Sequence, residues 1–525
     1  MAQPTGPRPE MSFESRYRQG DLAEFFPLSP GDVTSALALP REVPKAALRQ
    51  ALGRYAAKLG APEAVFEAVA KLEHPNSRAV LTGQQTGLLL GPTFTLSKAV
   101  TALKLARRLD SEAQPVVAVF WLASQDHDSA EIDHSYLLDL KETLIKVSLP
   151  LPEGVPSGRI GFEASWLASI EAQLAGFSAA AAHKADALEV LREAAAKAGS
   201  VADFFGALLY RLLGAEGLVV INPLEPDIAP LFKEVLAREL EQPLISSGLI
   251  NEAAERLSLQ GYAPQLGRGA GATNLFIEEN EGARRELLHF EGGTFRSKTR
   301  RYSRRELHDI LEREPSRLTP AAGVRPVSQD ALLPTVATVV GPGELRYFAQ
   351  LREVYSFHGV AMPLVWPRAT ITLLEPPVAR ILRKYGLEVS DVQRHFEESA
   401  QRLLLDLHGH GEVVERCLGG LEQLTAELAE HLGAIDPTLR STVGKTEARL
   451  RTGVERLKAK AAAALANRDE VTSKQLARLR LHLLPEGAPQ ERVISPFSPF
   501  MKFGVQPVME RVLSIEPEGE HVLEL

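Results

Sequence analysis

The feature that most constrains the fold is a strand, a glycine-bearing loop, a helix and a second strand within residues 79–122. Residues 79–81 (Ala-Val-Leu) predict the first strand, and the loop TGQQTGLLLGP follows at 82–92. The next segment has the apolar spacing of a helix, with Thr95 as a candidate N-cap. Residues 116–122 are a continuous apolar run, typical of a central parallel strand covered on both faces. This order predicts the opening of a doubly wound α/β sheet.

Later segments extend the same pattern. The chain before the first strand, 13–60, is expected to be a lead-in of short helices that carries no site. Helical stretches are predicted at 202–213 and 230–241. Buried strands are predicted at 217–222, 335–340 and 362–366. The fold class is therefore α/β, with a Rossmann-like doubly wound parallel sheet as its core.

Two segments interrupt the core and are expected to be insertions. The first, 141–200, carries an alanine-rich helix between Ser178 and Ala198 and is expected to be helical. The second, 262–322, contains a β-hairpin pattern with Gly292-Gly293 as a turn. Its predicted strands are 274–278, 285–290 and 294–297. The core then comprises residues 1–140, 201–261 and 323–385.

Residues 386–484 predict an antiparallel α-helical coiled coil. Apolar residues recur there at three- and four-residue steps, broken near Asp436-Pro437. Asp436 is a candidate cap for the second helix, and Pro437 fits its first turn. A second helix that continued to Leu484 would be on the order of 70 Å long. Such an arm buries little apolar area alone, so we expect a homodimer, and we expect the tail, 485–525, to pack on the body.

Composition limits the classes of partner. The formal charge of -8 and pI near 6.0 give no overall attraction to nucleic acid or to anionic membranes. Met1 to Glu10 has no apolar core of the kind a signal peptide needs, and no segment predicts a membrane span, so a cytoplasmic location is expected. The single cysteine, Cys417, excludes an internal disulfide and is expected to be a buried helix residue without chemistry.

The loop at 82–92 is the first candidate for ligand binding. Glycines at 83, 87 and 91 allow backbone amides to approach a phosphate or carboxylate at a helix N-terminus. Its spacing matches neither the dinucleotide nor the phosphate-loop fingerprint. A tight β-α connection with solvated glutamines is the alternative, and Lys98, one turn into the helix, is expected to lie in solvent.

The segment SQDHDSAEIDH at 124–134 is the second candidate. It follows the next parallel strand, so it reaches the same edge of the sheet. Its carboxylates and imidazoles suit acid/base work, ammonium binding or a hard divalent metal, and no metal is assigned. They are Asp126, His127, Asp128, Glu131 and His134. An acidic helix N-terminus is the alternative.

A third loop, GPGELRYF at 341–348, follows the strand at 335–340. Glu344 is a candidate for binding a substrate amine, and Arg346 or Tyr347 for binding a hydroxyl or carboxylate. Arg368, after the last strand, is a candidate anion clamp. A plain Gly-Pro-Gly turn is the alternative.

These segments together resemble the bacillithiol biosynthesis cysteine-adding enzymes, a family of cysteine ligases. The matching strings are TGQQTGLLLGPTFTLSKA at 82–99, PVVAVFWLASQDHDSAEIDH at 115–134, GPGELRYFAQL at 341–351, MPLVWPRATIT at 362–372 and QERVISPF at 490–497. The resemblance implies a Rossmann-type core related to class I aminoacyl-tRNA synthetases, with two connecting-peptide insertions and a coiled coil that takes part in dimerisation.

The resemblance also implies a reaction. Cysteine condenses with the amine of glucosaminyl-malate in the last step of bacillithiol biosynthesis, with ATP or ADP as the expected nucleotide. Related folds carry a histidine-bearing signature after the first strand, where this chain has Gln84-Gln85-Thr86-Gly87. Another synthetase-like nucleotidyltransferase or amide ligase, or a nucleotide-binding dimeric scaffold, is the alternative function.

Residue roles follow as hypotheses. The residues expected to assist proton transfer or bind the amine are Asp126, His127 and Asp128. Those expected to line the ligand cleft are Thr82, Gly83, Gln84, Gln85, Thr86 and Gly87. Those expected to complete the substrate pocket are Gly343, Glu344, Tyr347 and Arg368, the last holding an anionic group such as the malate carboxylates.

Overall fold

A computed structural model describes residues 11–525, so the expectation for Met1 to Glu10 lies outside the described residues. The chain divides into two compact units. Unit 1 is the chain up to Ile371 together with Ile494–Leu523, and unit 2 is Thr372–Val493 with Glu524–Leu525. The chain passes between them within β13 (Thr370–Leu374), between Val493 and Ile494, and within β14 (Glu520–Glu524).

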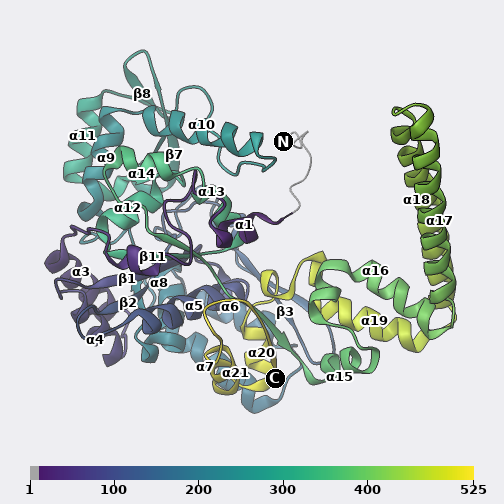
Figure 1. Cartoon of the computed structure of the whole chain (residues 1–525). Coiled ribbons are helices and arrows are strands. Elements are labelled where there is room, and N and C mark those ends of the chain that lie inside the picture. The colour runs from purple at the N-terminus through teal and green to yellow at the C-terminus, as the bar shows by residue number, and fades with distance from the viewer. Residues whose placement is uncertain (1–10) are drawn as a thin grey trace. The chain divides into compact units, whose positions relative to one another are not determined.

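Unit 1 is built on a five-stranded parallel sheet in the order β12-β11-β1-β2-β5, of which β11, β1 and β2 are labelled in Figure 1. Its strands are β1 (Arg78–Gln84), β2 (Val116–Leu122), β5 (Val219–Ile221), β11 (Thr335–Val340) and β12 (Leu364–Pro367). The strand order reverses between β1 and β11, as in a doubly wound sheet. The predicted Rossmann-like fold is confirmed, because every predicted core strand is present.

The β1–α5–β2 unit explains why this part of the chain folds as it does. All seven residues of β2 are buried, and it pairs in parallel with β1 from Arg78–Val116 to Gln84–Leu122. Helix α5 (Phe94–Leu109) joins the two strands. Thr93, not Thr95, is the N-cap residue, and its hydroxyl donates to the Ile494 carbonyl at 2.7 Å instead of capping the helix.

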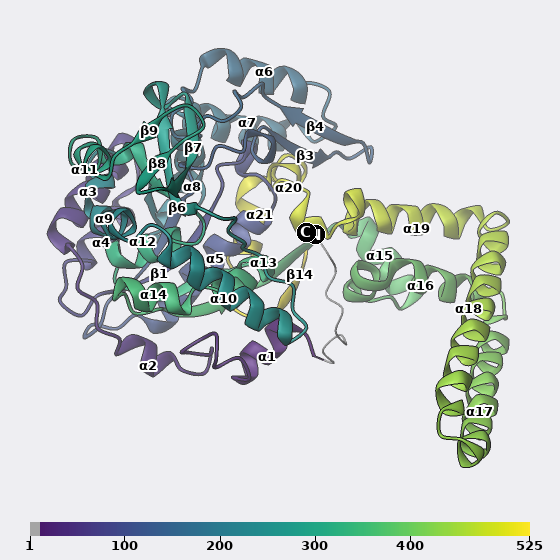
Figure 2. The same ribbon diagram turned by 90° about the horizontal axis from the view of Figure 1, so that it is seen from above.

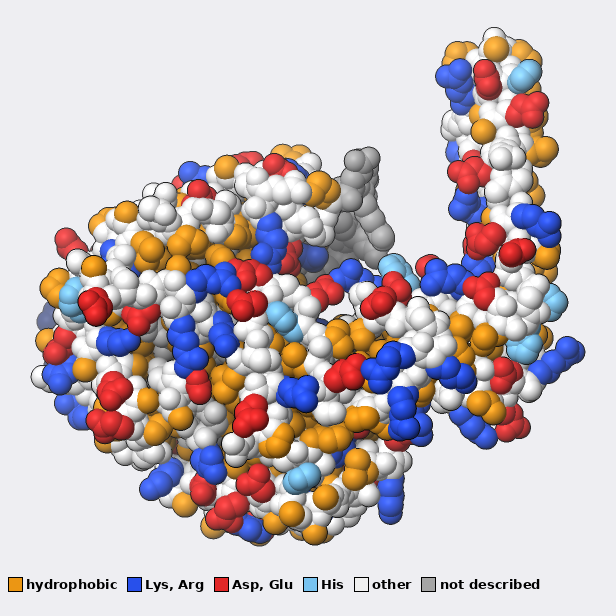
Figure 3. Space-filling view, turned by 60° about the horizontal axis from the view of Figure 1, so that its bottom comes forward, with side chains coloured by type: hydrophobic (Ala, Val, Ile, Leu, Met, Phe, Trp, Pro, Cys, Tyr) orange, Lys and Arg blue, Asp and Glu red, His pale blue; other side chains and the backbone are white. Residues whose placement is uncertain are grey.

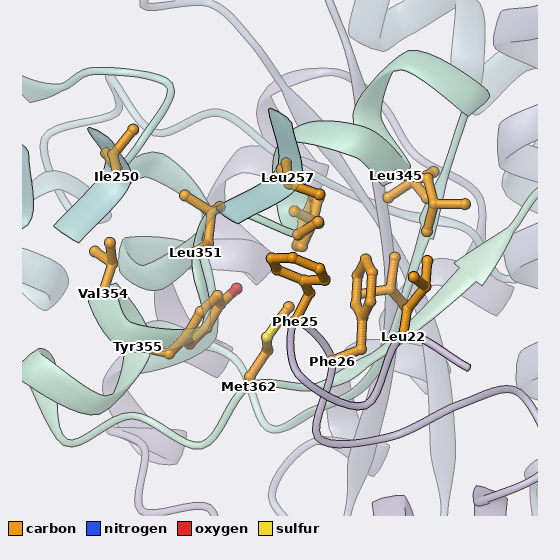
Figure 4. Packing of buried hydrophobic residues seen from close by; sticks show 14 of the residues in the cluster. Leu22, Phe25, Phe26, Ile250, Leu257, Leu345, Leu351, Val354, Tyr355 and Met362 are labelled. Atoms are coloured by element: carbon orange, nitrogen blue, oxygen red, sulfur yellow. The ribbon is translucent and has the colours of Figure 1, made fainter. Parts of the chain in front are cut away.

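The other helices of unit 1 surround this sheet (Figures 1 and 2). They are α1 (Phe13–Gln19), α2 (Val33–Leu37), α3 (Lys45–Lys58), α4 (Glu63–Lys71), α8 (Val201–Leu213), α9 (Lys233–Glu241), α10 (Ile245–Leu259), α12 (Arg325–Leu332), α13 (Pro342–Phe348), α14 (Arg352–His358), α20 (Phe497–Phe503) and α21 (Val505–Val512). Aromatic residues of the lead-in, Phe25 and Phe26, pack against Leu257 of α10 and Leu345 of α13 (Figure 4). The lead-in is therefore part of the core.

A β-hairpin that the sequence did not predict spans the expected start of the first insertion at residue 141. Strands β3 (His134–Leu138) and β4 (Leu144–Ser148) pair in antiparallel fashion before α6 (Ala164–Leu174) and the expected α7 (Ala181–Ala195). The hairpin was missed because its strands are short and only half buried on β4.

The second insertion is the predicted antiparallel region. Its sheet has the order β10-β6-β7-β8-β9. The strands are β6 (Ala272–Glu279), β7 (Arg284–Glu291), β8 (Thr294–Arg296), β9 (Arg301–Tyr302) and β10 (Leu318–Pro320), and α11 (Arg304–Arg313) precedes β10. Gly292 and Gly293 have φ of 58° and 80°, as the β7–β8 turn requires.

Unit 2 is helical and starts earlier than predicted. It contains α15 (Pro376–Tyr385), α16 (Val389–Leu407), α17 (Gly411–Ile435), α18 (Leu439–Ala466) and α19 (Glu470–Leu483). Residues 372–385, which were expected to end the core, belong here because Val378 and Leu382 of α15 pack with Leu479 and Leu483 of α19.

Helices α17 and α18 form the predicted antiparallel hairpin, and both lie in one arm in Figures 1 and 2. The second helix does not continue to Leu484: α18 ends at Ala466, and a new helix, α19, follows, with Asp469 at its N-cap accepting from the Thr472 amide at 3.0 Å. Asp436 accepts from the Thr438 amide at 2.8 Å in the turn before α18, but the N-cap residue of that helix is Thr438, which makes no side-chain capping hydrogen bond. The expected cap at Asp436 is therefore wrong, and Pro437 precedes the helix and does not lie in its first turn.

Two further findings concern exposure and length of helices. Cys417 is exposed, contrary to the expected burial, because the hairpin has only one seam and Cys417 lies off it.

Among residues 11–525, every helix is either too short or too polar to cross a lipid bilayer.

Candidate active site at the switch point of the sheet

The candidate site lies at the carboxyl ends of β1 and β11, where the strand order reverses. Gln84 ends β1, and Glu344 lies in α13 directly after β11. Open α/β sheets bind ligands at this position because two neighbouring loops diverge there. The first and third predicted loops therefore meet as expected.

Lys98 of α5 is the centre of this group. It is only 3% exposed, so the expectation that it lies in solvent is wrong. Its ammonium donates to the Gly83 carbonyl at 3.0 Å and to Gln84 Oε1 at 2.9 Å, and pairs with Glu344 Oε2 at 2.5 Å. Burial lowers the pKa of Lys98, and Glu344 opposes that shift. The helical period turns Lys98 inward, under the end of β1.

Glu344 is committed to internal partners. Besides Lys98, it accepts from the Gly341 amide at 2.8 Å, which makes it the N-terminal cap partner of α13. Burial would raise the pKa of Glu344, but Lys98 and the Gly341 amide hold it below its ordinary value. The carboxylate is ionised and already neutralised, so a substrate amine would have to compete with Lys98.

Three further side chains add positive charge and a hydroxyl. Arg325 of α12 donates to the Tyr347 hydroxyl at 2.9 Å, while its buried Nε has no hydrogen-bond partner among the described residues. Burial raises the pKa of Tyr347 to about 12. Arg368 is 6% exposed and donates to Ser97 Oγ at 3.0 Å. Arg346 and Gly343 are exposed, outside this group.

The glycine-bearing loop is not an open phosphate cradle. The amides of Gly87, Leu88 and Gly91 donate to the carbonyls of Gln85, Ile132 and Leu88. A Cβ on Gly83 would lie 2.7 Å from the Trp121 carbonyl, so glycine is needed there for close strand packing. The expectation that these amides bind an anion is therefore corrected for the three that are already bonded.

Two threonines of this loop also face inward. Thr82 is 1% exposed and donates to the Val339 carbonyl at 3.0 Å. Thr86 is 1% exposed and donates to Ser157 Oγ at 2.7 Å. Both side chains hold the loop to its neighbours and do not line the polar group around Lys98.

The acidic loop after β2 is tied to the first loop. Asp126 accepts from Gln85 Nε2 at 2.8 Å and from the His127 amide at 2.8 Å, and Gln85 also contacts Glu131. Burial would raise the pKa of Asp126, but the Gln85 hydrogen bond and a nearby arginine hold it below its ordinary value. Asp126 is thus an ionised acceptor suited to an ammonium group, whereas Asp128 is exposed.

That arginine is Arg285, which the second insertion contributes from β7. It stacks on Phe276 with its guanidinium carbon 3.9 Å from the ring centre, and donates to Thr319 Oγ1 at 2.8 Å and to the Pro320 carbonyl at 3.0 Å. Burial lowers its pKa to about 10, so it stays charged at neutral pH.

Arg285 determines which ring nitrogen of His127 carries the proton. Its Nη1 lies 3.3 Å from His127 Nδ1, and a guanidinium can only donate, so Nδ1 is the acceptor. Burial and the Arg285 charge lower the pKa of His127, which makes the ring neutral at pH 7. The neutral ring then carries its proton on Nε2. His127 is therefore a hydrogen-bond donor at Nε2, which differs from the general base expected for an uncommitted imidazole.

The group around Lys98 and the group around Asp126 are electrostatically coupled through Arg325, because the charges of both Glu344 and Asp126 raise the pKa of Arg325. His134 lies apart on β3 and pairs with Asp133 at 2.6 Å. Sequence reasoning missed Arg285 and Arg325, whose positions depend on long-range packing. Within residues 11–525, no three His, Cys, Asp or Glu side chains are arranged to hold a metal ion.

Comparison with known families agrees with this architecture. Residues 19–369 match the family model described as bacillithiol biosynthesis BshC, N-terminal Rossmann-like domain, and residues 371–521 match bacillithiol biosynthesis BshC, C-terminal coiled-coil domain. The chain belongs to the BshC family. The family expected from the sequence motifs is thereby confirmed, and the join between the two BshC domains falls beside the boundary between units 1 and 2.

Three BshC relatives illustrate the similarity, and each carries the name "Putative cysteine ligase BshC". One protein of Thermus thermophilus is 44% identical over 452 residues, covering 85% of this chain and 87% of its own. That of Geobacillus thermodenitrificans is 30% identical, covering 89% and 88%. That of Desulforamulus reducens is 28% identical, covering 95% and 94%.

Proposed function

We propose that this protein is the cysteine ligase that adds L-cysteine to the amine of glucosaminyl-malate in the last step of bacillithiol biosynthesis. The amine nitrogen attacks the activated carboxyl carbon of cysteine, the C–N amide bond forms, the C–O bond to the activating group breaks, and the amine loses a proton. The observation that carries the proposal is the juxtaposition of an ionised acceptor, Asp126, with a cationic group at the switch point of a BshC-family sheet.

The side chains divide into two roles. Asp126 accepts hydrogen bonds from the amine of a substrate and receives the proton that the amine loses. The neutral His127 donates from Nε2 to the carbonyl oxygen that becomes negative during attack, as an oxyanion-hole donor does. Arg325 and Arg368 hold anionic groups, of which the malate carboxylates are the expected ones.

A nucleotide fits the charge of the site but not the glycine loop. Arg325 has a buried Nε without a partner among the described residues, and, besides burial, the nearby charges of Arg368 and Arg325 lower the pKa of Lys98, so the group suits a polyanion. The amides of Gly87 and Leu88 already donate to backbone carbonyls, so they do not suit a phosphate. ATP would supply the free energy of condensation by activating the cysteine carboxyl, and Arg325 and Arg368 are the residues that would hold its phosphates.

A second copy of the chain is the proposed partner of the helical hairpin. Hydrophobic side chains are interspersed with charged ones along the hairpin in Figure 3. Leu424, Ile435 and Leu457 are 59%, 76% and 67% exposed in the single chain. Burial of these leucines and isoleucine against a symmetric copy would form the homodimer, and we expect the enzyme to work in the cytoplasm.

The direct test is to incubate the protein with L-cysteine, glucosaminyl-malate and ATP, and to detect bacillithiol and spent nucleotide by mass spectrometry. Product together with nucleotide consumption is expected. Product without nucleotide consumption would overturn nucleotide activation, and no product, even from a preformed cysteine thioester, would favour the scaffold alternative. Product from another amine in place of glucosaminyl-malate would favour a different amide ligase.

Variants of His127 test its role as a donor. His127→Gln keeps an N–H donor near Nε2 and should retain more activity than His127→Ala, which removes it. His134→Ala is the matched control, because His134 lies on β3 and pairs with Asp133, outside the group around Asp126. Equal activity of the His127→Ala and wild-type proteins would remove His127 from the site.

A further inference from the structure

A cavity of about 820 Å³ lies at the edge of the central sheet opposite the candidate site. Asp330, in its lining, precedes β11, and Ala361 precedes β12, whereas Gln84 and Glu344 follow their strands. Its volume is in the range of small-molecule pockets. Arg41, from the lead-in that was expected to hold no site, forms part of its wall.

The cavity holds two opposite charges with unused hydrogen-bonding atoms. Asp330 is 3% exposed, and its Oδ2 accepts from the Tyr355 hydroxyl at 2.5 Å. Arg41 donates from Nη1 to the Ala361 carbonyl at 2.6 Å. Its Nε and Nη2, and Asp330 Oδ1, are buried without a partner in the part of the chain that the structure describes. The two charges attract each other, yet neither satisfies the other's free atoms.

Such atoms are rare in folded proteins, because a buried charged donor or acceptor without a partner destabilises the native state. A second cavity, of about 950 Å³ beside β5, provides a contrast. Three of its cations, Lys58, Arg159 and Lys233, are ion-paired within 3.1 Å with a carboxylate. Among the described residues, the one buried side-chain atom without a partner in the wall of this second cavity is Glu278 Oε1. Unused atoms of both charges therefore occur together only in the first of these two cavities.

We propose that the cavity between the lead-in, α9, α12 and the β12 approach binds a free α-amino acid with an apolar side chain. The ligand carboxylate accepts from Nε and Nη2 of Arg41, and the ligand ammonium donates to Asp330 Oδ1. Phe232, Val235 and Val360 form an apolar part of the wall, beside the charged Glu42, Glu234 and Arg238, and this part suits an apolar side chain. The site is distinct from the one where cysteine is proposed to react, because it lies at the other end of the strands.

The test is isothermal titration of the full-length protein with L-leucine, L-methionine and L-phenylalanine. At least one should bind at a single site. N-acetyl-leucine, which lacks the ammonium, and leucinamide, which lacks the carboxylate, should each bind at least tenfold more weakly than leucine. Arg41→Lys, which keeps the charge but loses the paired donors, and Asp330→Asn should weaken amino-acid binding by at least tenfold. Lys233→Ala, in the contrasting cavity, should leave it unchanged.

Several outcomes would overturn the proposal. They are no binding of any of the three amino acids, equal binding of the blocked derivatives, and binding that both cavity variants retain. Circular dichroism and thermal unfolding of each variant separate loss of binding from loss of fold. Because the three probes are not the proposed substrates, failure here leaves the ligase proposal untouched, and failure of the ligase assay leaves this site untouched.

Discussion

Replacing Asp330 by asparagine should stabilise unit 1 by an amount that depends on pH. Burial raises the pKa of this carboxyl from 3.8 to about 6. Between these values the unfolded chain ionises while the folded chain stays protonated, so the wild-type protein loses stability as pH rises. At 1.36 kcal/mol per unit, the loss is about 3 kcal/mol, complete above pH 6. Asparagine cannot ionise, and its amide oxygen can still accept from Tyr355.

Urea unfolding followed by tryptophan fluorescence measures this effect in the right part of the molecule, because Trp121, Trp166 and Trp366 all lie in unit 1. All other carboxylates are common to both proteins, so they cancel in the difference between variant and wild type. The free-energy gap in favour of the Asp330→Asn protein should grow between pH 4.5 and 6.5 and then stay level. A gap that does not change with pH would refute the assigned burial of the charge.

Three other perturbations test other parts of the structure. Lys98→Met should lower the free energy of unfolding of unit 1 by about 2–3 kcal/mol in urea, because it leaves the Glu344 carboxylate without its cation. Adding Glu344→Gln to this variant should restore part of the lost stability. Destabilisation by the double variant equal to the sum of the two single variants would contradict the ion pair. Arg285→Met should raise the pKa of His127 toward 6.5, measured by NMR titration of the imidazole, and an unchanged pKa would rule out their contact. Leu457→Glu should shift a dimer to monomer in analytical ultracentrifugation, and an unchanged mass would exclude the hairpin as the interface.

The core of the fold could be predicted because its determinants are local. Continuous apolar runs such as 116–122 become parallel strands, and the antiparallel pattern of the second insertion gave β6, β7 and β8. The break near Ala466 was not predictable from apolar spacing, since alanine continues a helix pattern on either side. The β3–β4 hairpin was missed for a related reason: a half-buried five-residue strand carries too little periodicity to stand out.

The position of the candidate site could be predicted from the sequence, but the side chains that contact its residues could not. The strand–loop order puts Gln84, Asp126 and Glu344 at one edge of the sheet, and the structure brings their loops together. The inward direction of Lys98 depends on which face of α5 the sheet covers. The approach of Arg285 depends on how an insertion folds over the core. Neither the direction of Lys98 nor the approach of Arg285 can be inferred from the spacing of residues within one segment.

This difference has a chemical consequence for the proposed reaction. From the sequence alone, His127 beside two aspartates suggests a base, because a free imidazole with acidic neighbours has a raised pKa. In the folded chain the pKa moves the other way, because burial and the charge of Arg285 both lower the pKa of His127, and an N–H of Arg285 occupies Nδ1. In the proposed reaction the role of base therefore passes to Asp126, and the insertion that supplies Arg285 takes part in shaping the proposed site. Any BshC-type sequence with a neutral residue at the position of Arg285 should accordingly show a higher His127 pKa. Because the Arg285 charge also lowers the pKa of Asp126, the pH–rate profile of such a protein should fall at a higher pH on the acid side.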